Sequence, residues 1–281
     1  MSFGDVSKSA YRNAGISALV ALGVVSAVPG RAQPRSEPVP SIFRATLQEP
    51  EQRTPEISTE EMRQALASGG VVLDARPRME YAIGHIPGAA NVAAMPGLPM
   101  AQYISGVAEV GRLVHGDRAV PLVLYCNGPF CGKSKRLSGE LIKAGYTHVS
   151  RFQLGIPVWR ALGGVAQIEP EGLLYVLGKD STAVFIDTRS AAEFQSGSIP
   201  GARNIPLDAD QRTAREELEA AKNDGRLPMH DHNTRVIVFD RDGARARRTA
   251  ESIAHEAFDN AAFYGGAFEA LKSAVAVAQL R

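Results

Sequence analysis

One motif occurs twice in this chain at a fixed offset of 113 residues. The first copy runs from Asp74 to Ala89 and the second from Asp187 to Ala202. Both copies contain Asp-x-Arg, then Glu followed by an aromatic residue, then Gly and Ile-Pro-Gly-Ala at matching positions. Because each repeat unit is the size of a small domain that can bury its own core, the repeat predicts two similar domains in tandem.

A short apolar run follows each copy of the motif and ends at a loop. Leu122–Tyr125 leads into Cys126, and Val236–Phe239 leads into Asp240. A cysteine can act as a nucleophile, whereas the aspartate at the matching position carries no thiol. The sequence therefore predicts a duplication in which the first copy carries a nucleophile and the second does not.

Composition narrows the classes of partner. The 281 residues include 31 Lys and Arg against 30 Asp and Glu, which gives a formal net charge of +1. A nearly neutral chain with scattered basic residues has no long-range field that attracts nucleic acid or an anionic membrane. We expect no nucleic-acid partner. Because each half is long enough to fold by itself, we also expect no cofactor and no metal.

The N-terminus has the pattern of a secretory signal peptide. Lys8 and Arg12 precede the apolar run 16–28, which is short for a membrane span and is followed by Pro29-Gly30 and by small residues around a plausible cleavage site. We expect residues 1–32 to be removed and the mature protein to be periplasmic or secreted, without stable membrane insertion after cleavage. An uncleaved membrane anchor is the alternative.

Residues 33–55 are rich in Pro, Gln, Glu and Arg and show little apolar periodicity. Such a segment buries too little apolar surface to offset the entropy of ordering it. We expect a flexible linker, followed by one domain over residues 56–165 and a second over residues 166–281.

Each half alternates predicted strands and helices. Ser58 and Glu61 have the spacing of a capping box at a helix start, and the apolar run 71–73 has the length of a buried strand. Residues 134–143 follow the Cys126 loop with apolar positions on one helix face. This alternation predicts an α/β fold in which each half is a parallel sheet flanked by helices. In such sheets the chemistry lies at the carboxyl ends of the strands, where we place Cys126 and Asp240.

The loop after Cys126 favours an ionised thiol. It runs from a strand end to a helix start, so backbone N–H groups and the positive end of the helix dipole can converge on the sulfur. Lys133 adds a cation within the loop. Such surroundings lower the pKa of a thiol and attract an anionic substrate or leaving group.

Taken together, the residues of the repeat resemble the rhodanese family of sulfurtransferases, in two tandem rhodanese-like domains that cover nearly all of residues 56–281. The resemblance implies that Cys126 takes a sulfane sulfur from a small-molecule donor such as thiosulfate, holds it as a persulfide, and passes it to a thiol or protein acceptor. It also implies that the loop residues cradle the substrate. These are Asn127, Gly128, Phe130, Cys131, Gly132, Lys133 and Ser134.

Two features depart from the familiar family pattern. The loop from Cys126 to the matching helix position at Ser134 is two residues longer than the loop from Asp240 to Ala246, and the shorter loop is the one that resembles familiar rhodaneses. A longer loop makes a wider cradle, which puts thiosulfate specificity in question. The second departure is the order of the domains. Well-known tandem rhodaneses have the cysteine in the C-terminal domain, whereas here it lies in the N-terminal one.

The other repeated polar residues are expected to have structural roles near the site. Asp74, Arg76 and Glu80 are predicted to form an ion-paired network that fixes the turn after the strand, as are Asp187, Arg189 and Glu193. His85 matches Ser198 in the second half, and we expect a hydrogen-bonded turn residue rather than a general base.

Cys131 leaves two interpretations open. In an oxidising compartment the two cysteines of the chain can form a disulfide, and Cys131 can equally act as a resolving thiol that attacks a persulfide on Cys126. We favour a free or transiently paired Cys126, because a bridge within one short loop restricts little of the unfolded chain. A thiol-disulfide redox protein that uses both cysteines is therefore an alternative function.

Several other classes fit the sequence less well. A non-catalytic binding module is a further alternative, above all for the second half. A phosphatase built on Cys-x5-Arg is disfavoured, since Gly132 stands where the arginine is required. Asp240 and Asp242 resemble the turn of haloacid-dehalogenase phosphatases but fall late in the domain instead of on its first strand. His230 and His232 lack further clustered metal ligands and are expected in a solvated loop.

The N-terminal pattern makes a direct prediction. The protein recovered from a soluble periplasmic fraction should lack residues 1 to about 32, because a signal peptidase removes the apolar run. Intact-mass measurement of that fraction checks the cleavage site. Recovery of the full-length chain from the cytosol would contradict the prediction of export.

Overall fold

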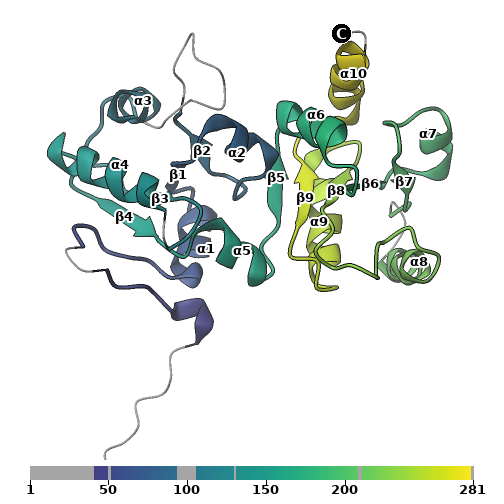
Figure 1. Cartoon of the computed structure of the whole chain (residues 1–281), viewed down its shortest axis with the longest axis horizontal. Coiled ribbons are helices and arrows are strands. Elements are labelled where there is room, and N and C mark those ends of the chain that lie inside the picture. Colours follow the sequence, from purple (N-terminus) through teal and green to yellow (C-terminus); the bar gives the residue numbers. More distant parts are fainter. Residues whose placement is uncertain (1–40, 50–51, 94–105, 130, 208–210, 280–281) are drawn as a thin grey trace, which may run out of the picture. The chain divides into compact units, whose positions relative to one another are not determined.

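The computed structural model describes residues 41–49, 52–93, 106–129, 131–207 and 211–279 (Figure 1). The predicted signal peptide, residues 1–32, and the loop residue Phe130 lie outside them. Within these ranges every helix is too short or too polar to cross a lipid bilayer.

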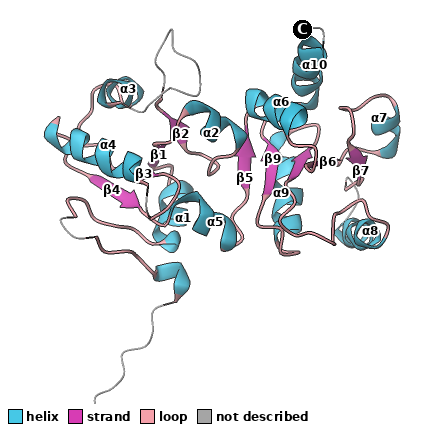
Figure 2. Ribbon diagram, in the orientation of Figure 1, coloured by secondary structure: helices cyan, strands magenta, loops and turns pink. Residues whose placement is uncertain are grey.

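The first domain is built on a four-stranded parallel sheet with the strand order β2-β1-β3-β4 (Figure 2). Its strands are β1 (Val71–Asp74), β2 (Ala90–Asn91), β3 (Leu122–Tyr125) and β4 (Val149–Phe152). In the register of β1 and β3, Asp74 lies beside Tyr125. The carboxyl ends of the two central strands therefore meet at one edge of the sheet.

Helices cover both faces of this sheet. Leu122 and Leu124 pack on one face against apolar residues of α3 (Val107–Leu113) and α4 (Gly132–Lys143). Val123 and Tyr125 point to the other face and pack against α1 (Thr59–Ala67) and α5 (Gly155–Ala161). A strand buried on both faces has apolar residues at every position, as β3 does. A short helix, α2 (Arg78–Ile83), follows β1.

The second domain repeats this architecture with a parallel sheet of order β5-β9-β8-β6-β7. Its strands are β5 (Ala166–Ile168), β6 (Val184–Asp187), β7 (Arg203–Asn204), β8 (Val236–Phe239) and β9 (Ala261–Tyr264). Helices α8 (Gln211–Asn223) and α9 (Gly243–Ala254) cover one face, and α6 (Pro170–Lys179) and α10 (Phe268–Gln279) cover the other. The prediction of an α/β fold with parallel sheets flanked by helices is confirmed.

Local sequence signals account for the ends of these elements. Ser58 and Glu61 form the predicted capping box, in which each side chain satisfies the other residue's backbone N–H. In the second domain Ser190 and Glu193 form a capping box at the start of α7 (Ala191–Gln195). The first domain has Pro77 at the matching helix start and no side-chain cap, so Glu80 is left free of that role.

The described part of the segment predicted as a flexible linker contacts the first domain. A short 3-10 helix, Ile42–Arg44, precedes Glu49, whose carboxylate lies 3.1 Å from the ammonium of Lys135. Arg151 in β4 donates its N–H to Pro55 O at 2.9 Å. Residues 41–49 and 52–55 are therefore held against the domain by ion pairs and backbone hydrogen bonds, which their polar composition did not indicate.

The Asp-Arg pairs of the predicted networks lie at the ends of β1 and β6, but the glutamates do not join them. Glu80 pairs with Lys133 and Glu193 with Arg241. The guanidinium of Arg76 donates to both carboxylate oxygens of Asp74, at 2.9 and 2.5 Å, and to Gly84 O at 2.7 Å. Both side chains are buried. Arg189 makes the same set of contacts with Asp187 and Gly197 O, at 2.7 and 2.9 Å from its Nη2. Each pair thus ties the strand end to the end of the following turn.

The two domains supply the remaining hydrogen bond to this carboxylate differently. In the first domain the Tyr125 hydroxyl donates to Asp74 Oδ2 at 2.6 Å, and it accepts from the Ile86 N–H at 3.0 Å. In the second domain Phe239 lies at the position of Tyr125, and Ser198 donates to Asp187 Oδ2 at 2.6 Å. Ser198 corresponds to His85. The hydroxyl donor therefore comes from a different sequence position in each domain, but the aspartate accepts a hydrogen bond from a hydroxyl in both.

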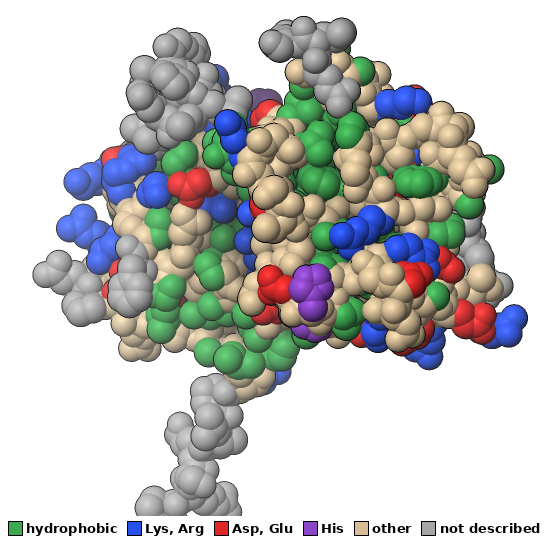
Figure 3. Space-filling model, turned by 45° about the vertical axis from the view of Figure 1, so that its right-hand side comes forward, with side chains coloured by type: hydrophobic (Ala, Val, Ile, Leu, Met, Phe, Trp, Pro, Cys, Tyr) green, Lys and Arg blue, Asp and Glu red, His purple; other side chains and the backbone are tan. Residues whose placement is uncertain are grey.

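On the face drawn in Figure 3, basic and acidic side chains both lie among hydrophobic side chains and backbone, and basic ones gather toward the left-hand edge. Both signs of charge are present, as the nearly balanced charge of the sequence indicates.

Replacing Tyr125 tests the exchange of hydroxyl donors. Tyr125→Phe should lower the free energy of unfolding by about 1–3 kcal/mol, because it leaves the buried Asp74 carboxylate and the Ile86 N–H short of a partner. Adding His85→Ser, which copies the second domain, should recover part of the loss. Denaturant unfolding of the two single variants and the double variant measures the coupling, and strictly additive losses would contradict it.

Candidate functional site

Cys126 lies at the carboxyl end of the central strand β3 and begins the loop that leads into α4. Its side chain points to the same sheet face as Leu122 and Leu124, and the residue is 2 % exposed. The apolar strand and the alternation of side chains along it fix this orientation. The sulfur is therefore presented to the start of α4.

Cys126 and Cys131 are joined by a disulfide. Cys131 is the N-cap residue of α4, and its N–H donates to Gly128 O at 3.0 Å, so the bridge closes a turn at the helix start. The Ser134 hydroxyl, in the first turn of α4, lies 3.6 Å from the Cys126 sulfur. The pairing that the sequence left open is thus present, and Ser134 is placed to donate to the same sulfur.

Gly155 packs closely against the backbone of the Cys126 loop. A Cβ atom on Gly155 would lie 2.4 Å from Cys126 O and 2.5 Å from Gly128 N, and the residue has a φ of +66°. Neither the contact nor the backbone conformation suits another residue. The next residue, Ile156, donates its N–H to Cys126 O at 3.1 Å. No sequence pattern predicted a role for Gly155, and its only signal was a glycine soon after β4.

Glu80 reaches the loop from α2. Its carboxylate accepts a hydrogen bond from the Asn127 side-chain amide and lies 3.9 Å from the Lys133 ammonium. Lys133, predicted as the cation of the loop, therefore shares its charge with Glu80. Glu80 therefore connects α2 to the loop at Asn127 and at Lys133.

The structure brings most of the predicted site residues together. The loop residues described are Asn127, Gly128, Cys131, Gly132, Lys133 and Ser134, with Glu80 beside them. Asp74 and Arg76 lie behind the loop and reach it through Tyr125, the residue before Cys126. His85 lies apart from them, beside Gln167 of β5.

His85 lies at the contact between the two domains. Its backbone pairs with Gln167 of β5, with N–H to O distances of 2.9 and 2.8 Å. Its ring stacks on Tyr81 and has its Nδ1 3.1 Å from Tyr81 O. Burial lowers the pKa of His85 to about 4, so the ring is neutral near pH 7. Its surroundings suit a packed turn residue and do not connect it to Cys126.

Asp240 occupies the matching position in the second domain and is surrounded by protein donors. The Thr188 hydroxyl donates to Asp240 Oδ2 at 2.7 Å, and the Arg245 Nε donates to Oδ1 at 3.2 Å. The residue is 2 % exposed. The side chain of Arg241 pairs with Glu193 instead. Hydrogen bonds from Arg241 and from Ser190 lower the pKa of Glu193 to about 2. The second loop is therefore satisfied internally by its own carboxylate.

The described residues hold no cluster of three or more side chains that could bind a metal ion. His232, part of the His-Asp-His segment, stacks on Phe258 with ring centroids 4.7 Å apart.

The chemistry available to the first loop depends on its redox state. In the disulfide form Cys126 has no free thiol. After reduction by two electrons the thiolate would face the N-terminus of α4, a helix of 12 residues, and the Ser134 hydroxyl. Both groups favour the charged sulfur. The reduced loop is thus equipped for nucleophilic chemistry, and the oxidised loop is equipped for thiol exchange.

Two segments, residues 58–162 and 172–274, each match the family model described as rhodanese-like domain. An HTH-type transcriptional regulator of Mycobacterium tuberculosis is 34 % identical over 102 residues, or 36 % of this chain and 39 % of the regulator. The chain thus spans about two fifths of that relative's length.

The solved structures to which the chain is similar include two transferases. A thiosulfate sulfurtransferase from Pseudomonas aeruginosa is 22 % identical, with a TM-score of 0.31 and coverage of 76 % of this chain and 41 % of that chain. A 3-mercaptopyruvate sulfotransferase from Escherichia coli is 19 % identical, with a TM-score of 0.32 and coverage of 76 % and 98 %. The two family matches together cover more than half of the chain, which belongs to the rhodanese-like domain family.

Proposed function

We propose that the first domain is a sulfurtransferase that moves a sulfane sulfur through a persulfide on Cys126. The observation that carries this proposal is the position of Cys126, at the end of a central strand and facing the N-terminus of α4, in a chain of the rhodanese-like family. The donor is a small molecule such as thiosulfate, and the acceptor is a thiol or another nucleophile on a small molecule or protein.

The first half-reaction follows from the reduced loop. The Cys126 thiolate attacks the sulfane sulfur of the donor, the sulfur–sulfur bond of the donor breaks, and its electron pair leaves with the departing group. With thiosulfate that group is sulfite. The N-terminal end of α4 favours both the attacking thiolate and the anionic leaving group. In the second half-reaction the acceptor attacks the outer sulfur and the Cys126 thiolate is restored.

The disulfide supports a second role for Cys131. A thiolate on Cys131 can attack the inner sulfur of the Cys126 persulfide, so that a disulfide forms and hydrosulfide leaves with the electron pair of the broken bond. A dithiol reductant then reopens the disulfide by supplying two electrons. Cys131 would in this way discharge the persulfide when no acceptor is present and return the loop to the paired form seen here.

A thiol-disulfide redox protein is the second candidate function. The bonded pair Cys126–Cys131 at a helix start favours it, because such a pair can exchange with another protein's thiols without any sulfane sulfur. The two functions differ in the need for Cys131, since sulfur transfer to an external acceptor requires Cys126 alone.

We infer that the second domain does not turn over substrate. Its loop holds Asp240 against Thr188 and Arg245 and leaves no thiol, so it serves as a scaffold or recognition domain for the first. We also propose that the protein works outside the cytosol, since the N-terminal pattern is that of an exported chain and oxidising compartments favour paired cysteines.

Substitution of the two cysteines separates the candidate functions. Cys126→Ser should abolish transfer from thiosulfate to a thiol, because a serine hydroxyl does not form a persulfide. Cys131→Ser should still gain the mass of one sulfur atom at Cys126 and pass it to an external thiol. It should no longer release sulfide without an acceptor.

Mass spectrometry of the loop peptide and a sulfide assay measure both steps. Full transfer by Cys126→Ser would exclude the proposal that Cys126 carries the sulfur. A Cys131→Ser variant that takes up no sulfur would favour the redox protein.

The second loop gives a matched pair of variants. Asp240→Asn should lower the free energy of unfolding by about 0.3–2 kcal/mol, the scale of a charge lost at a helix N-terminus, with little effect on Cys126 chemistry. Asp242→Asn is the control, because it removes the same charge at the start of α9 but keeps the N-cap. A larger loss in Asp240→Asn then measures the contacts with Thr188 and Arg245. Calorimetry of both variants and a transfer assay check the result, and a large loss of transfer in Asp240→Asn would contradict a non-catalytic second loop.

A further inference from the structure

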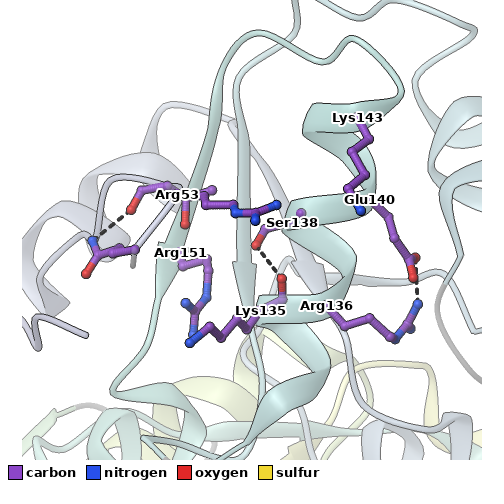
Figure 4. Close-up of a pocket in the computed structure, with 10 residues that line it drawn as sticks. Arg53, Lys135, Arg136, Ser138, Glu140, Lys143 and Arg151 are labelled. Carbon is purple, nitrogen blue, oxygen red and sulfur yellow. Dashed lines mark hydrogen bonds and ion pairs between the residues drawn. The ribbon is translucent and has the colours of Figure 1, made fainter. Parts of the chain in front are cut away.

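The first domain contains a polar pocket of about 320 Å³ beside α4 (Figure 4). It lies between that helix, β4 and residues 52–54 of the N-terminal segment. Five of its ten lining residues are basic, and one is acidic. The basic residues are Arg53, Lys135, Arg136, Lys143 and Arg151. The loop residues Cys126 to Lys133 do not line it, so the pocket is separate from the site described above.

Arg151 forms the buried end of the pocket. The residue is 2 % exposed, and its Nη1 lies 3.4 Å from both Glu49 Oε2 and Glu56 Oε1. Its Nε is buried and has no hydrogen-bond partner within the described part of the chain. A buried guanidinium N–H without an acceptor is costly, so an acceptor from a ligand would be favoured there.

More cations face the pocket from its rim. In Figure 4 the side chain of Lys135 extends toward Arg151, and the guanidinium of Arg53 lies across the pocket toward Ser138. Neither Arg53 nor Lys143 has an ion-pair partner among the residues that the structure describes, and both are exposed. Their charges are therefore available to a ligand.

The carboxylates nearby offset only part of this charge. Glu49 lies 3.1 Å from Lys135 and is shared with Arg151. The side chain of Glu56 is buried, and burial raises its pKa to about 7 against the opposing effect of Arg151. Near neutral pH Glu56 is thus protonated in a large fraction of molecules and neutralises less of the basic cluster.

Gly139 in the middle of α4 keeps the pocket open. It lines the pocket, and no atom lies within 4 Å of the position where a Cβ atom would be. Glycine inside a helix costs about 1 kcal/mol relative to alanine. Close packing against the protein does not require this glycine, whereas space for a ligand over the helix would.

We propose that this pocket binds a small dianionic oxyanion of the phosphate and sulfate class, either as a free ion or as a phosphate monoester. Arginine guanidinium groups present paired N–H donors that match tetrahedral oxyanions, and lysine adds a point charge. A cavity of 320 Å³ suits a small molecule of this kind. The bound anion would connect residues 52–54 to α4 and β4 and stabilise the first domain.

Thermal unfolding and calorimetric titration test the proposal on the full chain. Sodium sulfate, sodium phosphate and glycerol 3-phosphate are each compared with sodium chloride at equal ionic strength. We expect a saturable rise in Tm and measurable heat of binding with at least one dianion. Tighter binding of glycerol 3-phosphate assigns a phosphate monoester, and equal or tighter binding of the inorganic ions assigns a free ion.

Two variants and a control locate the binding. Arg53→Gln combined with Lys143→Gln should weaken the affinity about tenfold or more, the effect of losing roughly 1.4 kcal/mol of interaction. Gly139→Leu should fold stably and also lose binding, because its side chain fills the open space. Lys179→Gln in the second domain is the matched control and should bind as the parent does. Cys126→Ser should also bind normally, which separates this proposal from the proposed sulfur transfer.

Two results would overturn the proposal. One is the absence of saturable binding by all three dianions. The other is an affinity that is unchanged in both the Arg53→Gln, Lys143→Gln double variant and Gly139→Leu.

Discussion

The buried pair of Asp74 and Arg76 organises the first domain around its reactive loop. Arg76 ties the end of β1 to Gly84 at the end of the following turn, and Asp74 accepts a hydrogen bond from Tyr125, the residue before Cys126. A buried charge must be paired and fully hydrogen-bonded to be tolerated, so these contacts fix each other. The position of the sulfur at the end of β3 depends on this network.

Comparison of the two domains shows how one framework serves two different loops. The Asp-Arg pair is kept in both, while the hydroxyl that completes it comes from Tyr125 in one and from Ser198 in the other. The glutamate that the motif repeats in both domains has a different role in each. Glu193 caps α7 and pairs with Arg241, whereas Glu80 has no capping role and contacts Asn127 and Lys133. The first framework therefore supports a loop that places the Cys126 sulfur beside Ser134 at the start of α4, and the second holds Asp240 among its own donors.

The disulfide lies at the N-terminus of α4, and the basic pocket lies along one side of the helix. The helix dipole and the first-turn Ser134 face the sulfur at its N-terminus, while Lys135, Gly139 and Lys143 present a separate cationic face along its length. The apolar positions between them, such as Leu137 and Leu141, are fully buried against the sheet. One amphipathic helix thus supports the core with one face and leaves another available for a ligand.

The sequence by itself determined the repeat, the fold class and the place of Cys126 and Asp240 at strand ends. These follow from local patterns, because apolar runs, caps and glycine turns act over a few residues. It also indicated that Asp74 and Arg76 pair, since two residues separated by one position after a strand can reach each other. The pairing of Cys126 with Cys131 stayed open, because the redox state of two nearby thiols depends on the loop's conformation.

Only the tertiary structure decided which distant residues meet. Gly155, which follows the carboxyl end of β4, packs against the Cys126 loop. Tyr125 in β3 donates a hydrogen bond to Asp74 in the neighbouring strand β1. The contacts that residues 41–49 and 52–55 make with the first domain could not be foreseen either, because polar composition does not reveal ion pairs formed with residues far along the chain. Such contacts depend on strand order and helix packing, which no local stretch of sequence encodes.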